Sequence, residues 1–261
     1  INNPDLLYFS KPTFYSYVNL NIFSFRNIDL ARKVKYKPRK DNEKRRTRQE
    51  SIIRIGRTYN DFNDYLSIHP EASIVEMDTV EGIKGGKVFL TLLFRNYNFM
   101  LIFIMDSKTM DEVEKVFIRI KKIIGIDTFK RLFEVILTDN GSEFFNPISI
   151  EVDYETGEVL SHVFYCDPYC SYQKGSIEKN HEYIRYILPK YSSFNNLTQE
   201  DCDLIASHIN STSRTILNNK TPYEAVQTLI SEDIINKLNI KLISPEHVNL
   251  SLSLLKKKIN N

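Results

Sequence analysis

The sequence predicts an α/β fold with a mixed sheet, in which three antiparallel strands precede a parallel strand and helices flank the sheet. Three short apolar segments, at 73–80, 87–94 and 99–105, are separated by Gly85-Gly86 and by the polar residues 95–98. Short apolar runs divided by such turns are typical of an antiparallel meander. A helical pattern and a fourth apolar segment, 133–138, then follow, which is the order expected of a mixed sheet with helices on its faces.

The patterns of individual segments support this order. Residues 99–105 are apolar at every position, as in a central strand covered on both faces. Residues 109–124 carry apolar side chains at helical spacing and predict the crossover helix. Between 148 and 165, two alternating runs surround Gly157 and predict a hairpin.

The remaining segments are predicted to be mainly helical. Pro12 marks the start of a short helix near the beginning, and aromatic residues at spacing three predict another within 56–70. Further helices are expected at about 176–188, at 198–214 and after Thr221-Pro222, while the last thirty residues are weakly helical.

Composition is that of an ordinary globular protein, with 261 residues, 42% of them hydrophobic and 26% charged. The longest apolar run is far too short to cross a bilayer, and no secretory leader is evident, so we expect a cytoplasmic protein without a membrane partner. The first residue is Ile1, which suggests a fragment or a processed product.

Charge is distributed unevenly along the chain. Residues 32–48 hold ten basic side chains and two acidic ones, a local balance of +8, which leaves −6 for the remainder of a chain whose net charge is +2. A basic segment of this kind suits phosphate backbones, although a solvated linker is the alternative. The basic residues expected to contact DNA here are Arg39, Lys40, Arg45 and Arg46.

Three cysteines do not suggest a disulfide framework. With His208 they could be imagined as a zinc site, but their spacings match no familiar zinc pattern. Reduced thiols are the preferred interpretation of Cys166, Cys170 and Cys202.

Three carboxylates are found within or next to predicted strands and helices. Asp78 interrupts the first apolar strand, Asp139 ends the fourth, and Glu178 lies in the first turn of a helix after Ser176. Taken singly, each has an ordinary explanation, because an acid in a first helical turn complements the dipole and an aspartate before Asn-Gly forms turns. Together, such carboxylates have the oxygen ligands to hold two magnesium or manganese ions for phosphodiester chemistry.

Three sequence blocks carry a resemblance to a known family. Glu76-Met-Asp-Thr-Val80, Leu137-Thr-Asp-Asn-Gly-Ser-Glu-Phe144 and Tyr172-Gln-Lys-Gly-Ser-Ile-Glu-Lys-Asn180 resemble the three blocks of DDE transposases and retroviral-type integrase cores, most closely the insertion sequence 30 family. The resemblance covers about residues 8–228.

This resemblance implies a ribonuclease H-like fold and a DNA transposase. Asp78, Asp139 and Glu178 would bind two Mg or Mn ions, cut the transposon ends and join their 3′-hydroxyls to a target duplex. Since two ends must be brought together, a homodimer or larger assembly on DNA is expected, in a bacterial, nucleoid-associated protein. DNA contacts are expected from the polar residues near the carboxylates, namely Asn140, Lys174, Lys179 and Arg185.

Two features depart from the family pattern. Asp139 and Glu178 are 39 positions apart, which is long for such cores and is explained by the predicted hairpin, and Tyr172 stands where tryptophan is frequent. Two alternatives stay open: a ribonuclease H-type nuclease that only hydrolyses, with Glu76 or Glu143 as a further ligand, and an inactive DNA-binding remnant. His181 could touch DNA, but a surface histidine without a catalytic part is the preferred interpretation.

The predicted organisation has four parts. Residues 1–31 resemble the end of a helix-turn-helix DNA-binding segment, and 32–70 form a basic linker with a short helix. Residues 71–215 are the integrase-like catalytic core, and 216–261 a C-terminal helical extension.

Overall fold

The computed structural model describes residues 10–25 and 52–255, and the chain divides into two compact units, Ile1–Arg45 and Arg46–Asn261. In the first unit, α1 (Lys11–Asn19) begins after Ser10, whose side-chain oxygen accepts the N–H of Thr13. The helix predicted at Pro12 is therefore confirmed. The four basic residues predicted to contact DNA, Arg39, Lys40, Arg45 and Arg46, lie outside the described residues.

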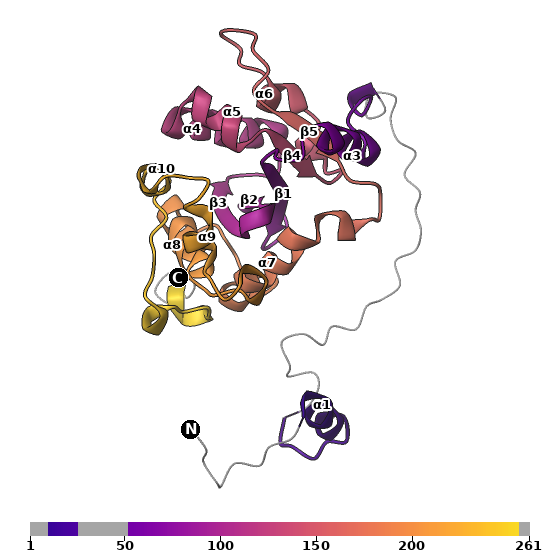
Figure 1. Ribbon diagram of the computed structural model, residues 1–261. Coiled ribbons are helices and arrows are strands. Elements are labelled where there is room, and N and C mark those ends of the chain that lie inside the picture. The colour runs from indigo at the N-terminus through magenta and orange to yellow at the C-terminus, as the bar shows by residue number, and fades with distance from the viewer. Residues whose placement is uncertain (1–9, 26–51, 256–261) are drawn as a thin grey trace. The chain divides into compact units, whose positions relative to one another are not determined.

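The second unit is built around a five-stranded mixed sheet with the order β3-β2-β1-β4-β5 (Figure 1). β1 pairs with β2, and β2 with β3, in antiparallel fashion, while β4 runs parallel to β1 and β5 parallel to β4. This arrangement confirms the predicted ribonuclease H-like sheet. The prediction that 99–105 is a central strand is wrong, because this strand lies at the edge of the sheet, where it is nevertheless almost entirely buried. The strands are β1 (Ile74–Glu81), β2 (Val88–Phe94), β3 (Phe99–Met105), β4 (Val135–Thr138) and β5 (His162–Tyr165).

Helices cover the sheet. β3 is connected to β4 by α4 (Met110–Ile124) and α5 (Ile126–Leu132), which form the predicted crossover. The rings of Phe129, in α5, and Phe133 stack with their centroids 4.8 Å apart. α3 (Tyr59–Ile68) lies beside β5, where Phe62 meets Phe164 (Figure 1). The remaining helices are α7 (Gly175–Ile187), α8 (Gln199–Asn210), α9 (Pro222–Val226) and α10 (Glu232–Lys237).

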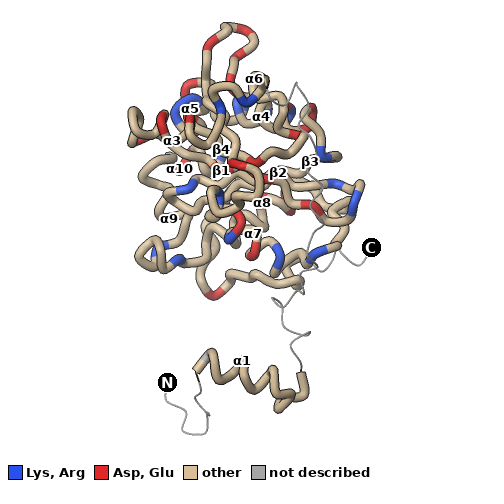
Figure 2. The backbone as a smooth tube through the Cα atoms, turned by 90° about the vertical axis from the view of Figure 1, so that its right-hand side faces the viewer, with Lys and Arg blue, Asp and Glu red and all other residues tan. Residues whose placement is uncertain are grey.

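The predicted hairpin at 148–165 is wrong in its first half. Pro147 occupies a first-turn position and residues Pro147–Glu151 form a short helix, α6, while pairing is limited to one bridge between Val152 and Val159. Glu151 explains the difference, because Arg57 and the N–H of Val163 both bind its carboxylate. The second half of the segment becomes β5, and the loop between, which projects beyond α6, carries only acidic charges (Figure 2).

The C-terminal helices share the core of the sheet. Tyr223, Val226 and Ile235 are buried in the same apolar cluster as the residues of β1 to β3. The boundaries predicted at 70/71 and 215/216 stay predictions. Among the described residues, no helix combines the length and apolar character that a membrane crossing needs.

Candidate active site

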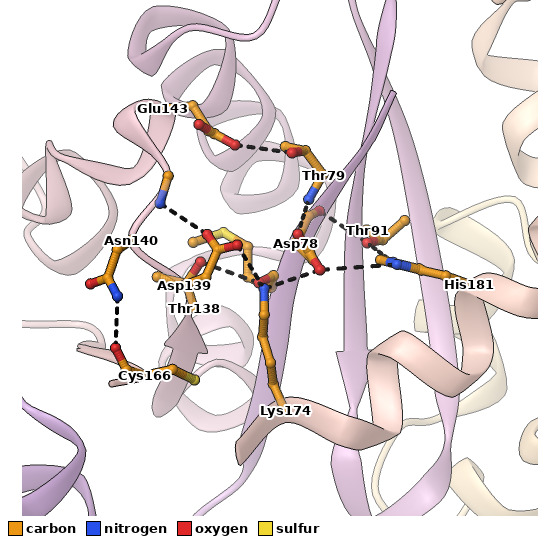
Figure 3. Close-up of polar contacts among 12 residues, drawn as sticks. Asp78, Thr79, Thr91, Thr138, Asp139, Asn140, Glu143, Cys166, Lys174 and His181 are labelled. Carbon is orange, nitrogen blue, oxygen red and sulfur yellow. Dashed lines mark hydrogen bonds and ion pairs between the residues drawn. The ribbon is translucent and has the colours of Figure 1, made fainter. Parts of the chain in front are cut away.

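The register of the sheet brings Asp78 and Asp139 together. β1 and β4 run parallel with Met77 opposite Thr138, so the next residue of each strand's path, Asp78 and Asp139, lies at the same level beside the end of β4. Asp78 still belongs to β1, whereas Asp139 follows the last residue of β4 and accepts the N–H of Gly141. Two positions 61 residues apart are thereby neighbours (Figure 3).

Lys174 lies between the two aspartates (Figure 3). Its Nζ is 3.0 Å from Asp78 Oδ2, 3.3 Å from Asp139 Oδ2 and 3.5 Å from the carbonyl oxygen of Met77. The lysine side chain is only 4% exposed. Burial lowers the pKa of Lys174, but the two carboxylates outweigh burial and raise it above its ordinary value, so the ammonium stays charged.

The negative charge of Asp78 is not fully compensated by Lys174. Burial raises the pKa of the Asp78 carboxyl, the negative charge of Asp139 raises it further, and Lys174 and the N–H of Thr79 only partly oppose them. The net pKa is above the ordinary range. Two carboxylates sharing one ammonium therefore make a site that favours additional positive charge.

His181 faces Asp78 and is not the surface histidine that we expected. Its Nδ1 is 4.0 Å from Asp78 Oδ2, and its side chain is 16% exposed. Thr91 donates its only hydroxyl hydrogen to the carbonyl of Asp78, so Thr91 Oγ1 accepts from His181 Nε2 at 2.8 Å. Burial, followed by the charges of Lys174 and Arg185, lowers the pKa of His181 to about 3, and the ring is neutral at ordinary pH.

Glu76 holds the helix that carries these side chains. It is buried at 1% exposure, and its Oε1 accepts from Arg95 Nε at 2.7 Å. Its Oε2 accepts the backbone N–H of Ile177 in the first turn of α7, also at 2.7 Å, and Arg95 donates to the carbonyl of Gln173. Glu76 thus anchors the start of α7 to β1.

Glu143 is engaged on the other side of β1. Its Oε1 accepts from the hydroxyl of Thr79 at 2.9 Å and lies 3.4 Å from Lys108 Nζ. A Cβ at Gly141 would approach the carboxylate to 2.6 Å, so a larger residue there would displace the side chain of Glu143. Glu76 and Glu143, the two additional carboxylates weighed as metal ligands, therefore each have partners of their own.

Glu178 occupies the predicted first turn of α7 and is exposed. In the described part of the chain, no group of three or more His, Cys, Asp or Glu side chains is arranged to hold a metal ion, so the structure brings together Asp78 and Asp139 without Glu178. The oxygens around Lys174 nevertheless fit a divalent cation, because carboxylate and carbonyl oxygens are the ligands of Mg²⁺ and Mn²⁺.

The other predicted site residues lie around this pair. Asn140 donates to the carbonyl of Cys166 and links the ends of β4 and β5. Arg185, half-buried, donates to the carbonyl of Glu81 at the end of β1. Lys179 is exposed and lines a cavity of about 380 Å³ beside the start of α7.

The imagined zinc site is wrong. Cys166 is buried in the cluster beneath α3, whereas Cys202 is buried in the main core on α8. His208 uses its Nδ1 to accept the N–H of Asn249. The cysteines are free, as predicted.

The strand order and the carboxylate pair between β1 and β4 define a ribonuclease H-like domain. No family model matches the sequence. The putative integrase ORF3 of Spiroplasma virus SpV1-R8A2 B is 28% identical over 209 residues, which cover 79% of this chain and 59% of that protein. Transposase InsI of insertion sequence element IS30C from Escherichia coli (strain K12) is 28% identical over 152 residues, which cover 58% of this chain and 37% of that protein.

Among solved structures, the catalytic core domain of BIV integrase is similar with a TM-score of 0.41 and 15% identity, over 60% of this chain and 95% of that chain. In sequence, the chain is thus similar to an insertion-sequence transposase, that of IS30C, and to a putative viral integrase. It spans less than two thirds of the length of either of these two relatives.

Proposed function

We propose that this chain is the catalytic part of a DNA transposase, which cleaves transposon ends and transfers their 3′-hydroxyls into target DNA with the help of divalent metal ions. The single observation that carries the proposal is the pair Asp78 and Asp139, brought together by the parallel register of β1 and β4 around a buried cation. The sequence relationship to transposases and an integrase supports the same reaction class.

Asp78, Asp139 and Glu178 are the proposed ligands of two Mg²⁺ or Mn²⁺ ions. Such ions, when bound, activate the attacking hydroxyl or water and stabilise the leaving oxygen in an in-line displacement. Glu76 serves this site indirectly, because its bond to the N–H of Ile177 fixes the first turn of α7, on which Glu178 is carried. His181, neutral and bonded to Thr91, holds one side of Asp78 without adding charge.

DNA is the proposed partner, as transposon ends and as target duplex, bound by a homodimer or a larger assembly. Lys179 is exposed next to Glu178 and is suited to a phosphate contact. Asn140 and Arg185 already bind backbone carbonyls, so their contribution to DNA binding would use their remaining donors. Arg39, Lys40, Arg45 and Arg46 are proposed to bind phosphates as well.

A strand-transfer assay tests the proposal. A labelled donor duplex and a plasmid target are incubated with wild type, Asp139→Asn and Glu178→Gln in Mg²⁺ or Mn²⁺. We expect joining by the wild type only, with a loss on the order of a thousandfold in each variant, because several kcal/mol of transition-state stabilisation are removed.

Glu182→Gln, the same substitution one turn later on the exposed side of α7, is the matched control and should join ends at nearly the wild-type rate. Nicking without joining would favour a nuclease that only hydrolyses. DNA binding without any cleavage in either metal would identify an inactive DNA-binding remnant and overturn the proposal.

A further inference from the structure

We propose that Lys174 is an internal counter-cation that occupies the place of a divalent metal between Asp78 and Asp139, and that it must leave before the metal binds. This inference rests on the proposed function, because it requires that the two aspartates bind metal. It concerns what the protein does in the absence of metal and which side chain moves when metal arrives.

The surroundings of the ammonium support this role. A lysine ammonium has three N–H donors and no acceptor, and Lys174 Nζ faces three oxygens, from Asp78, Asp139 and the backbone of Met77. All three belong to the oxygen types that bind Mg²⁺ or Mn²⁺. The cation and the metal would therefore use the same atoms.

No other lysine or arginine among the described residues forms an ion pair with Asp78 or Asp139. The remaining basic side chain beside Asp78 is His181, whose Nδ1 lies 4.0 Å from Asp78 Oδ2 and whose Nε2 bonds the hydroxyl of Thr91. An ammonium and a divalent ion a few ångströms apart repel each other strongly in a partly buried site. Binding of metal to both aspartates thus requires the ammonium to move away.

The local structure allows this movement without disturbing α7. Lys174 precedes the helix as its N-cap residue, and its charge sits at the end of a flexible four-carbon side chain. The helix itself is anchored independently, by Glu76 at the N–H of Ile177 and by Arg185 at the carbonyl of Glu81. The side chain can therefore swing towards solvent while Glu178 keeps its place.

Amine labelling of the full wild-type chain tests the movement directly. The protein is treated briefly with acetic anhydride with and without Mn²⁺, and acetylation of each lysine is measured by mass spectrometry. Lys174, almost fully buried without metal, should become severalfold more reactive with Mn²⁺, whereas exposed Lys190 should not change. Unchanged labelling of Lys174 at saturating Mn²⁺ would overturn the inference.

Calorimetric titration with Mn²⁺ in the absence of DNA tests the competition. Lys174→Met should bind Mn²⁺ on the order of tenfold more tightly than wild type, because a repelling charge is gone. Lys190→Met removes an equal charge at an exposed position and should change the affinity little. Equal or weaker binding by Lys174→Met would contradict the inference, and if this variant does not fold, the labelling result decides.

Asp78→Asn separates this inference from the proposed function. If Asp78→Asn abolishes Mn²⁺ binding but Lys174→Met does not strengthen it, the metal site stands and the role of Lys174 is wrong. If Asp78→Asn binds Mn²⁺ as wild type does, the metal site itself is wrong and both proposals fail.

Discussion

Glu76 and Asp78 lie on the same face of β1, but their carboxylates differ in their bonding partners. Glu76 has partners of its own, the guanidinium of Arg95 and the N–H of Ile177, each at 2.7 Å. Asp78 shares one ammonium with Asp139, and the pKa of its carboxyl is raised. The first is a structural anchor, whereas the second belongs to a pair with excess negative charge.

This difference shows how a buried acid can be assigned. Burial differs only in degree, since the side chain of Glu76 is 1% exposed and that of Asp78 17%, and both lie against α7 on a central strand. A carboxylate whose two oxygens each have a hydrogen-bond or ion-pair partner stabilises the fold. A pair of carboxylates held by a single shared cation retains affinity for a second cation. Glu76 is therefore assigned to architecture and Asp78 to the proposed chemistry.

The largest expected effect on stability comes from Glu76→Ala. This change leaves Arg95 and the start of α7 without their acceptor, and breaking such a buried pair costs about 3–5 kcal/mol in the free energy of unfolding. Urea denaturation measures the loss. Glu81→Ala, which removes a half-exposed acid paired with Lys108, should cost at most about 1 kcal/mol, and equal losses in the two variants would contradict the assignment.

Lys174→Met without metal should cost less, about 2 kcal/mol, because Asp139 is 45% exposed and water compensates part of its charge. The two aspartates would then repel each other with no cation between them. Adding Asp139→Asn to Lys174→Met removes this repulsion and should recover part of the stability in urea denaturation. Strictly additive losses would show that the three groups do not form one unit.

His181 should produce a pH dependence of stability. Its pKa in the folded state is about 3, against 6.5 as its ordinary value, so the unfolded chain binds more protons between these values. Stability is therefore lost as pH falls below 6.5, by up to about 1.4 kcal/mol per pH unit. His181→Asn should flatten this slope when urea denaturation is compared at pH 7, 6 and 5, and an unchanged slope would mean that the ring is charged in the fold.

The smallest effect is expected for Thr91→Val. The hydroxyl of Thr91 donates to the carbonyl of Asp78 and accepts from His181, and removing it leaves both groups unpaired at a cost of about 1 kcal/mol. Thermal unfolding detects the loss. A wild-type melting temperature in Thr91→Val would show that this bond does not hold His181 beside Asp78.

Four of the five strands were predictable because their signal is local. The apolar runs 99–105 and 133–138 predict buried strands, and Gly85-Gly86 predicts a turn. β5 was not recognised as part of the sheet, because its pairing partner is β4, more than twenty residues away. Alternation in 148–152 resembles a strand, yet Pro147 and the contact between Glu151 and Arg57 favour a helix there.

The candidate site shows the same division. Asp78 within an apolar strand, Asp139 after another and Glu178 in a first helical turn could be selected from these positions and from the three family-like blocks. The ordinary roles of each could not be excluded. The side chains that face Asp78 carried no such signal. Lys174 was expected to contact DNA and His181 to lie on the surface, and nothing in their neighbouring residues indicates that both face Asp78.

The order of strands and helices, the apolar core and the acids available for chemistry follow from local patterns, because periodicity and turn residues act within a few positions of the chain. Which acids are anchors and which form a pair is set by the folded arrangement. That outcome depends on the parallel register of β1 and β4 and on the placement of α7 across them. The charge that surrounds a buried carboxylate is set by residues distant in sequence, and its energy depends on distances that no local pattern encodes.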